Sequence, residues 1–144
     1  LNMLHVMFNT LAGKKICLLG FAFKADTGDT RESPAIRIAK RLMEEKADLV
    51  ITDPKAINNA KDDLKGVMGN ISYVEDPYEA AEGCCALALM TEWSLYKELD
   101  YREIYRKMAK PAFVFDGRNI LDTLALHEIG FNVFPIGKPS LTHF

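Results

Sequence analysis

The sequence lacks several features that mark whole classes of protein. It holds only three cysteines, and an odd number with two of them adjacent is a poor disulfide framework. None of Cys17, Cys84 and Cys85 has the CxxC or Cys/His spacing of a zinc site. The net charge is −2 at pH 7, so the composition has no basic excess for nucleic acid or for an anionic membrane surface.

Long hydrophobic runs are absent as well. No stretch approaches the length of a membrane-spanning helix, and residues 1–10 lack the basic region and apolar core of a secretory signal. The three cysteines fall in apolar stretches, which favours buried, reduced thiols and a cytoplasmic location. We therefore expect partnership with neither nucleic acid nor a membrane.

Recognised catalytic motifs are also lacking. The sequence contains no GxSxG, no HExxH and no paired-carboxylate motif. His5, His127 and His143 lie near the chain ends or on a predicted helix surface, where a solvated histidine is expected. No cysteine has an activating partner nearby in the sequence. We expect this chain to supply neither a catalytic residue nor a metal site.

The 144 residues suit a single domain with a sizeable core. The chain opens with Leu, and the spacing of Leu1, Leu4 and Phe8 is typical of the end of a helix. We therefore expect residues 1–10 to be the remnant of a preceding helix or linker. Residues 11–137 form the predicted domain, and residues 138–144 a loose tail.

Short apolar runs alternate with amphipathic segments along the predicted domain. The runs, continuous rather than alternating, are typical of strands covered on both faces, and they span residues 16–19, 49–52, 71–74, 85–90, 112–115 and 131–136. Helix starts are indicated at Ser33-Pro34, Asp76-Pro77, Asp100 and Asp122, with a weaker helix over 58–64. This predicts an α/β, Rossmann-like, doubly wound and mostly parallel six-stranded sheet. Helices cover both faces, and the strand order is 3-2-1-4-5-6.

Such sheets bind ligands beyond the carboxyl ends of the strands, where the strand order reverses between strands 1 and 4. The loop after strand 1 is not GxGxxG, because about a dozen residues separate the strand from the next helix. It offers Lys24 and Arg31, either as phosphate-binding cations or as solvated loop charges. This loop therefore does not predict a standard dinucleotide site.

Two further strand ends offer polar groups to the same edge. Arg118 can present its planar guanidinium to a phosphate or form an ion pair with Asp116 or Asp122. Asp53 lies where dinucleotide folds place a ribose-binding acid, although Asp-Pro is also a common way to open a loop. Three aromatic residues suit either a stacked base or the core: Tyr78, Trp93 and Tyr96.

Several motifs resemble one family in the same order along nearly the whole chain. They are GFAFK at 20–24, DTRESP at 29–34, DPYEA at 76–80, TEW at 91–93 and FDGRN at 115–119, together with MFNT at 7–10. They are similar to the C-terminal UDP-binding domain of the UDP-glucose 6-dehydrogenases, within the UDP-glucose/GDP-mannose dehydrogenase family. The resemblance implies an enzyme that oxidises UDP-glucose to UDP-glucuronate, with two NAD molecules reduced in succession.

The resemblance also implies roles for single residues. Phe23 and Lys24 match a pair that contacts the UDP-sugar, and Arg118 matches the substrate-contacting arginine of the FDGR motif. Arg31, within the DTR motif, matches the arginine that reaches across to NAD. NAD itself would be held mainly by an N-terminal domain, because GxGxxG is lacking. The Gly-Gly-Ser-Cys context of the family's catalytic cysteine is lacking too.

Three hypotheses follow for the function. The chain is a UDP-glucose-binding domain that is inactive alone and works with N-terminal and central regions of the same polypeptide, in a homo-oligomeric enzyme. Alternatively, it is a stand-alone nucleotide-sugar-binding or assembly module. The third hypothesis is the same domain of a sister enzyme acting on UDP-N-acetylmannosamine or GDP-mannose. The TEW and FDGRN motifs favour the first hypothesis over the third.

Overall fold

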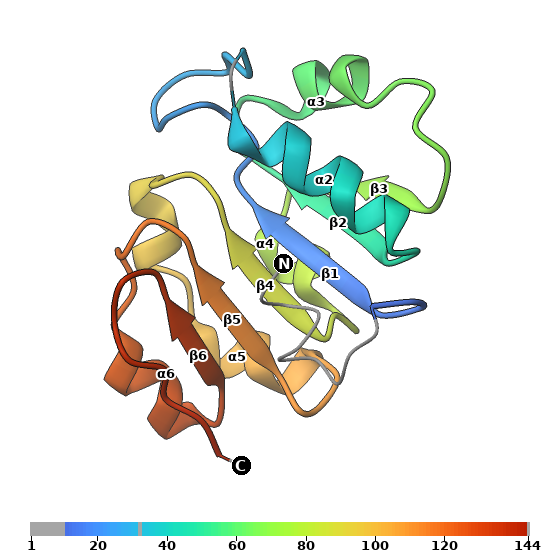
Figure 1. Ribbon diagram of the computed structural model, residues 1–144. Coiled ribbons are helices and arrows are strands. Elements are labelled where there is room, and N and C mark those ends of the chain that lie inside the picture. Colours follow the sequence, from blue (N-terminus) through green and yellow to red (C-terminus); the bar gives the residue numbers. More distant parts are fainter. Residues whose placement is uncertain (1–10, 32, 144) are drawn as a thin grey trace.

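A computed structural model describes residues 11–31 and 33–143, which contain a six-stranded sheet in the order β3-β2-β1-β4-β5-β6 (Figure 1). All five neighbouring pairs run parallel. The strands are β1 Lys15–Leu19, β2 Asp48–Thr52, β3 Ile71–Tyr73, β4 Ala86–Leu89, β5 Phe113–Asp116 and β6 Asn132–Pro135. The predicted Rossmann-like fold is confirmed, including the reversal of strand order between β1 and β4.

Helices connect the strands, and four of them begin at the predicted caps. The helices are α2 Pro34–Glu44, α3 Ile57–Asp63, α4 Pro77–Ala81, α5 Tyr101–Lys107 and α6 Thr123–Ile129, with a 3-10 helix, η1, at Ser94–Lys97. The side chains of Ser33, Asp76, Asp100 and Asp122 each accept a hydrogen bond from a backbone amide of the first turn. Since these amides have no partner inside the helix, such caps stabilise the starts of α2, α4, α5 and α6.

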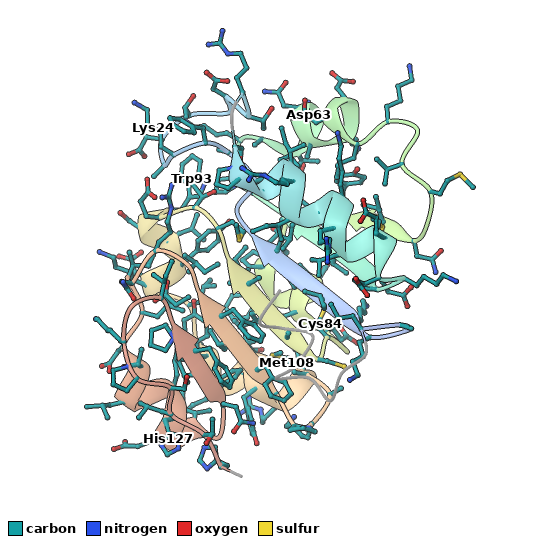
Figure 2. The ribbon with its side chains drawn as sticks, in the orientation of Figure 1. Lys24, Asp63, Cys84, Trp93, Met108 and His127 are labelled. Carbon is teal, nitrogen blue, oxygen red and sulfur yellow. The ribbon has the colours of Figure 1, made fainter. Side chains whose placement is uncertain are left out.

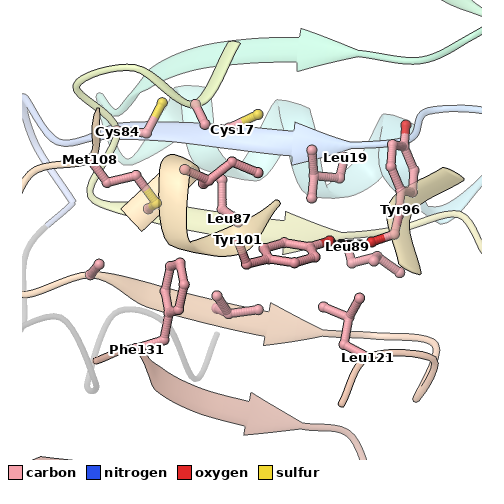
Figure 3. Packing of buried hydrophobic residues seen from close by; sticks show 14 of the residues in the cluster. Cys17, Leu19, Cys84, Leu87, Leu89, Tyr96, Tyr101, Met108, Leu121 and Phe131 are labelled. Atoms are coloured by element: carbon pink, nitrogen blue, oxygen red, sulfur yellow. Dashed lines mark hydrogen bonds between the residues drawn. The ribbon is translucent and has the colours of Figure 1, made fainter. Parts of the chain in front are cut away.

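The sheet has a separate hydrophobic core on each face. Because successive strand residues point to opposite faces, Ile16 and Leu18 pack with α2 and α3, whereas Cys17 and Leu19 pack with α4, η1, α5 and α6. Figure 3 shows the second core, in which Tyr101 reaches the backbone carbonyl of Tyr96. Both faces are therefore covered, as the continuous apolar runs predicted.

Two segments differ from the expectation. The 3-10 helix η1 was not predicted, since its four residues carry no periodic apolar pattern. The tail, expected to be loose, is attached to β6: Leu141 forms a bridge with Val133, and the amide of His143 donates to Asn132. Leu141 also packs against the second core, which explains its order. The helix remnant expected at 1–10 lies outside the described residues.

Within residues 11–31 and 33–143, no helix combines the length and hydrophobicity needed to cross a lipid bilayer.

Candidate functional site

The loop after β1 leaves the sheet where the strand order reverses. Gly20 turns the chain with φ 94°, a conformation that favours glycine, and its amide donates to the carbonyl of Thr52 at 2.8 Å. A Cβ on Gly20 would lie 2.5 Å from the Cβ of Thr91. Thr91 in turn donates from its hydroxyl to the carbonyl of Ala22 at 2.8 Å. The loop therefore starts in close contact with both neighbouring strand ends.

Asp53, directly after β2, holds the loop after β1 through hydrogen bonds to its backbone. Its Oδ2 accepts from the amides of Phe21 and Ala22, at 2.8 and 3.0 Å, and from Nε1 of Trp93 at 3.2 Å. Its Oδ1 accepts from the amides of Lys55 and Ala56, both at 2.8 Å.

Asp53 is only 3% exposed, and five donors already occupy its carboxylate. The interpretation of Asp53 as a ribose ligand is therefore wrong. It is a buried organiser that joins the loops after β1, β2 and β4, and a charge this deeply buried requires such donors.

Asp116 organises the turn that carries Arg118. It is 1% exposed, and Oδ1 accepts from the amides of Arg118 and Asn119, at 3.0 and 2.8 Å. Oδ2 accepts from the amide of Leu121 at 2.9 Å. Gly117 passes close to β4, where an added Cβ would lie 3.0 Å from the carbonyl oxygen of Leu89. The backbone on both sides of Arg118 is thus held against the sheet edge.

The guanidinium of Arg118 reaches over the loop after β1. Its Nη2 donates to the carbonyl of Phe23 at 3.1 Å, and its Nε pairs with Glu92 Oε2 at 2.8 Å. Arg118 pairs with Glu92 and not with Asp116 or Asp122, the two partners considered from the sequence, and the Asp116 carboxylate is already occupied by backbone amides. Glu92 Oε1 also accepts from the amide of Ala25 at 3.2 Å.

Three of the four predicted site residues therefore come together. Phe23 is 43% exposed, Lys24 is exposed, and the side chain of Arg118 is 34% exposed. Figure 2 shows Lys24 and Trp93 near each other at the carboxyl-end edge of the sheet. This edge of the sheet therefore carries one exposed aromatic residue and two cationic residues, on loops that buried carboxylates hold in place.

Arg31 lies farther along the same loop and makes a different contact. Its Nη2 lies 2.8 Å from Asp29 Oδ2 and its Nε 3.0 Å from Oδ1, a two-pronged pair in which the arginine side chain is 89% exposed. The hydrogen bonds from Arg31 lower the pKa of Asp29 to about 2.

The aromatic residues considered for base stacking serve the fold instead. Trp93 is 6% exposed and Tyr96 1%, and burial raises the pKa of the Tyr96 hydroxyl far above its ordinary value. The hydroxyl of Tyr78 accepts from the amide of Asp100 at 2.8 Å. Phe23 is therefore the aromatic side chain of this edge that remains accessible to a ligand.

The cysteines lie away from this surface. Cys17 is within β1, and Cys84 and Cys85 precede β4, with Cys84 toward the opposite edge of the sheet (Figure 2). All three are free thiols, Cys17 and Cys84 buried and Cys85 half-buried. A hydrogen bond with Cys84, together with burial, holds the pKa of Cys17 well above its ordinary value.

In the described part of the chain, no three or more His, Cys, Asp or Glu side chains are grouped so that they could hold a metal ion. Nor do these residues fit NAD in the standard Rossmann manner. A dinucleotide needs a short glycine turn leading directly into a helix, whereas here 14 positions, 20–33, separate β1 from α2. The acid after β2, which would hold the ribose, is consumed by its five internal donors.

Two cavities flank this edge without including it. One, of about 350 Å³, lies between η1, α5 and α6 and is lined by residues such as Tyr101, Ile120 and Leu126. The other, of about 300 Å³, follows β2 and β3 and is lined by Lys55, Lys61 and Glu75. Neither of these two cavities is lined by Phe23, Lys24 or Arg118.

The fold and the cationic edge together define a Rossmann-like domain of the kind that takes its ligand at the point of strand reversal. Residues 17–123 match the model of the UDP-glucose/GDP-mannose dehydrogenase family, UDP binding domain. The chain belongs to this family.

Named relatives agree. Over 92% of the chain, it is 50% identical to UDP-glucose 6-dehydrogenase of Bos taurus and 46% identical to UDP-glucose 6-dehydrogenase 1 of Arabidopsis thaliana. The matches cover 29% and 32% of these two proteins, so the chain spans less than a third of their length.

Solved structures show the same architecture. A UDP-glucose dehydrogenase from Pyrobaculum islandicum superposes with a TM-score of 0.73 at 28% identity, covering 93% of this chain and 27% of that one. An NDP-N-acetyl-D-galactosaminuronic acid dehydrogenase from Methanosarcina mazei reaches a TM-score of 0.81 at 22% identity. This second match covers 99% of this chain and 28% of that one, and it speaks for the fold alone.

Sequence reasoning missed the residues that hold the site together. In the sequence Glu92 stands out only as the middle of the TEW motif, and Asp53 only as either a ribose-binding acid or the opening of a loop. A signal for both exists, because each follows the end of a strand next to the reversal point. Some charged residues at these strand ends face the ligand side and others bind the backbone. The difference depends on side-chain direction, which the sequence does not show.

Proposed function

We propose that this chain is the UDP-sugar-binding domain of an NAD-dependent UDP-glucose 6-dehydrogenase. Such an enzyme converts UDP-glucose, two NAD and water to UDP-glucuronate and two NADH. The observation that carries the proposal is the convergence of Phe23, Lys24 and Arg118 at the strand reversal, supported by Asp53, Asp116 and Glu92.

The chemistry of this surface suits a nucleoside diphosphate sugar. A diphosphate carries about two negative charges, and Lys24 and Arg118 supply two cations for charge-assisted hydrogen bonds. Arg118 uses Nη2 to bind the Phe23 carbonyl and Nε to bind Glu92. The remaining N–H donors of its guanidinium are left for the ligand. The exposed ring of Phe23 offers an apolar contact to the base or sugar.

The remaining assignments rest on the same resemblance. Arg31, held by Asp29, contacts an NAD molecule that is bound mainly by another domain of the enzyme. Residues 11–137 form the binding unit, no residue of this chain is catalytic, and the chain alone does not turn over UDP-glucose. The enzyme is cytoplasmic and homo-oligomeric, and the free thiols support the location.

UDP-glucose is preferred over other nucleotide sugars in this proposal. Identity to proteins named UDP-glucose 6-dehydrogenase is 46–50%. A stand-alone module remains the competing function, and its distinguishing feature is a reading frame that encodes this domain alone.

Calorimetric titration of the chain with UDP, UDP-glucose and GDP-mannose tests the proposal. We expect weak, saturable binding of UDP and UDP-glucose, and weaker binding of GDP-mannose. Lys24→Ala and Arg118→Ala should each lower the affinity for UDP by about tenfold, whereas Lys65→Ala, which removes an exposed lysine remote from the site, should not. Absence of any UDP binding, or equal effects of all three variants, would count against the proposal.

A further inference from the structure

Lys24 lies between two peptide groups that are each hydrogen-bonded to a side chain from another loop. The carbonyl before it, that of Phe23, accepts from Arg118 Nη2 at 3.1 Å. The amide after it, that of Ala25, donates to Glu92 Oε1 at 3.2 Å. Arg118 and Glu92 are themselves paired, at 2.8 Å between Nε and Oε2. These contacts form a closed ring across the loops after β1, β4 and β5.

We propose that Glu92 is a positioning residue of the nucleotide-sugar site, which sets the backbone of Lys24 and the guanidinium of Arg118 in one binding geometry. The inference rests on the proposed function, because it assumes that these two cations receive the diphosphate. Glu92, like Arg118, contacts both other loops through its side chain, and it is the residue bonded to the peptide that follows Lys24. It touches no ligand in this role, and it acts through Lys24 and Arg118.

Both oxygens of Glu92 are needed for this role. Oε1 serves the loop and Oε2 serves the arginine, so a side chain with a single acceptor holds only one of them. The ring is only partly exposed, with 37% of the Glu92 side chain and 34% of the Arg118 side chain accessible. Such a fixed arrangement removes part of the ordering cost that a flexible lysine and arginine would otherwise incur on binding.

Electrostatics alone predicts the opposite result, which makes the role testable. Glu92 carries a negative charge next to a surface that receives an anion. If this charge acted only through its field, its removal would strengthen the attraction to a diphosphate. If Glu92 acts by positioning, its removal weakens binding, because the two cations lose their common geometry. The sign of the change in UDP affinity therefore separates the two roles.

The experiment compares Glu92→Ala, Glu92→Gln and Glu98→Ala in titrations with UDP. Glu98 is exposed and lies six residues farther along the chain, so its replacement makes the same charge change away from the ring. We expect Glu92→Ala to weaken UDP binding by about fivefold and Glu92→Gln by less, with Glu98→Ala unchanged. Unchanged or tighter binding by Glu92→Ala overturns the inference.

A double-mutant cycle shows whether Glu92 acts through the arginine. In the Arg118→Ala background, Glu92→Ala should lose most of its effect on UDP affinity, because the partner that it orients is already gone. A full, additive loss in that background would assign Glu92 to general stability of the domain and overturn the positioning role.

A ligand-free measurement keeps the inference separate from the proposed function. Trypsin cleaves after Lys24, at the peptide bond to Ala25, and the amide of Ala25 donates a hydrogen bond to Glu92. Cleavage at this bond should be about tenfold faster in Glu92→Ala, while cleavage after Lys65 stays unchanged. If the unmodified chain fails to bind UDP, the proposed function fails whatever the proteolysis shows. If it binds UDP but neither affinity nor cleavage responds to Glu92→Ala, only the inference fails.

Discussion

The indole nitrogen of Trp93 donates a hydrogen bond to Oδ2 of Asp53 at 3.2 Å, although the two residues lie 40 positions apart. The same oxygen accepts from the amides of Phe21 and Ala22, directly before the exposed Phe23. The contact therefore links the end of β2, the end of β4 and the start of the candidate binding loop. It gives this edge of the sheet a rigid base.

Replacing the carboxylate of Asp53 tests how much of this edge depends on it. In Asp53→Asn the oxygen still accepts, but the new NH2 group faces the donors that the other carboxylate oxygen served, so two or three buried N–H groups lose their partner. We expect the free energy of unfolding to fall by about 3 kcal/mol, measured by urea denaturation. Asp62→Asn removes the same charge at an exposed position of α3 and should change stability little. Equal stability of both variants would contradict the organising role of Asp53.

Trp93 offers a direct optical signal for the site, because it is the only tryptophan of the chain. It is 6% exposed and bonded to the carboxylate that holds the binding loop. We expect saturating UDP to change the intensity or wavelength of its emission, with the same apparent dissociation constant as calorimetry. Arg118→Ala should shift this titration to higher UDP concentration. If calorimetry shows UDP binding but the emission stays unchanged, the contact between Trp93 and Asp53 does not respond to the ligand.

Gly20 is predicted to tolerate no side chain. Its φ of 94° disfavours other residues, and an added Cβ would lie 2.5 Å from the Thr91 side chain. We expect Gly20→Ala to lower the free energy of unfolding by about 3 kcal/mol. Gly66 is a matched control, since its φ is 85° but nothing lies within 4 Å of an added Cβ. Gly66→Ala should therefore cost only about 1 kcal/mol, which reflects the backbone strain alone.

Much of this fold could be predicted from the sequence, because its strongest signals are local and repeated. The apolar run at 49–52 and the Ser33-Pro34 cap each lie within one residue of the element observed, β2 at Asp48–Thr52 and α2 at Pro34–Glu44. The strand order observed is also the one predicted from the Rossmann-like topology that alternating strands and helices favour. The 3-10 helix at Ser94–Lys97 escaped prediction, since a single tight turn leaves no periodic pattern.

The candidate site was only partly predictable. The convergence of Phe23 and Arg118 followed from the rule that ligands bind at the strand reversal. The partner of Arg118 did not, because Glu92 is 26 positions away along the chain and nearer carboxylates were available. Asp116, the nearest of these, is saturated by the amides of its own turn. Such competition between acceptors is settled by three-dimensional geometry, which local patterns do not carry.

The pairing of Asp29 with Arg31 predicts an acid-resistant carboxylate. Hydrogen bonds from Arg31 lower the pKa of Asp29 to about 2 in the folded chain, from an ordinary value of 3.8. A lowered pKa contributes stability that is present above the unfolded value and is lost as the pH falls from 3.8 through about 2. NMR titration of the Asp29 carboxyl carbon should report the lowered value, and Arg31→Ala should return it toward 3.8. Since the pair is exposed, the effect on overall stability should be small.

The three thiols should differ in how readily they react in the folded chain. Cys17 and Cys84 are buried, and Figure 3 shows their side chains near each other in the core between the sheet and its helices. The hydrogen bond with Cys84 and burial raise the pKa of Cys17, so little of its thiolate forms at neutral pH, and Cys84 is protected because its sulfur is buried. A water-soluble thiol reagent should therefore label the half-buried Cys85 first, with Cys17 and Cys84 reacting only after denaturant is added. Rapid labelling of Cys17 in the folded chain would contradict its place in the core and reopen the question of a reactive cysteine.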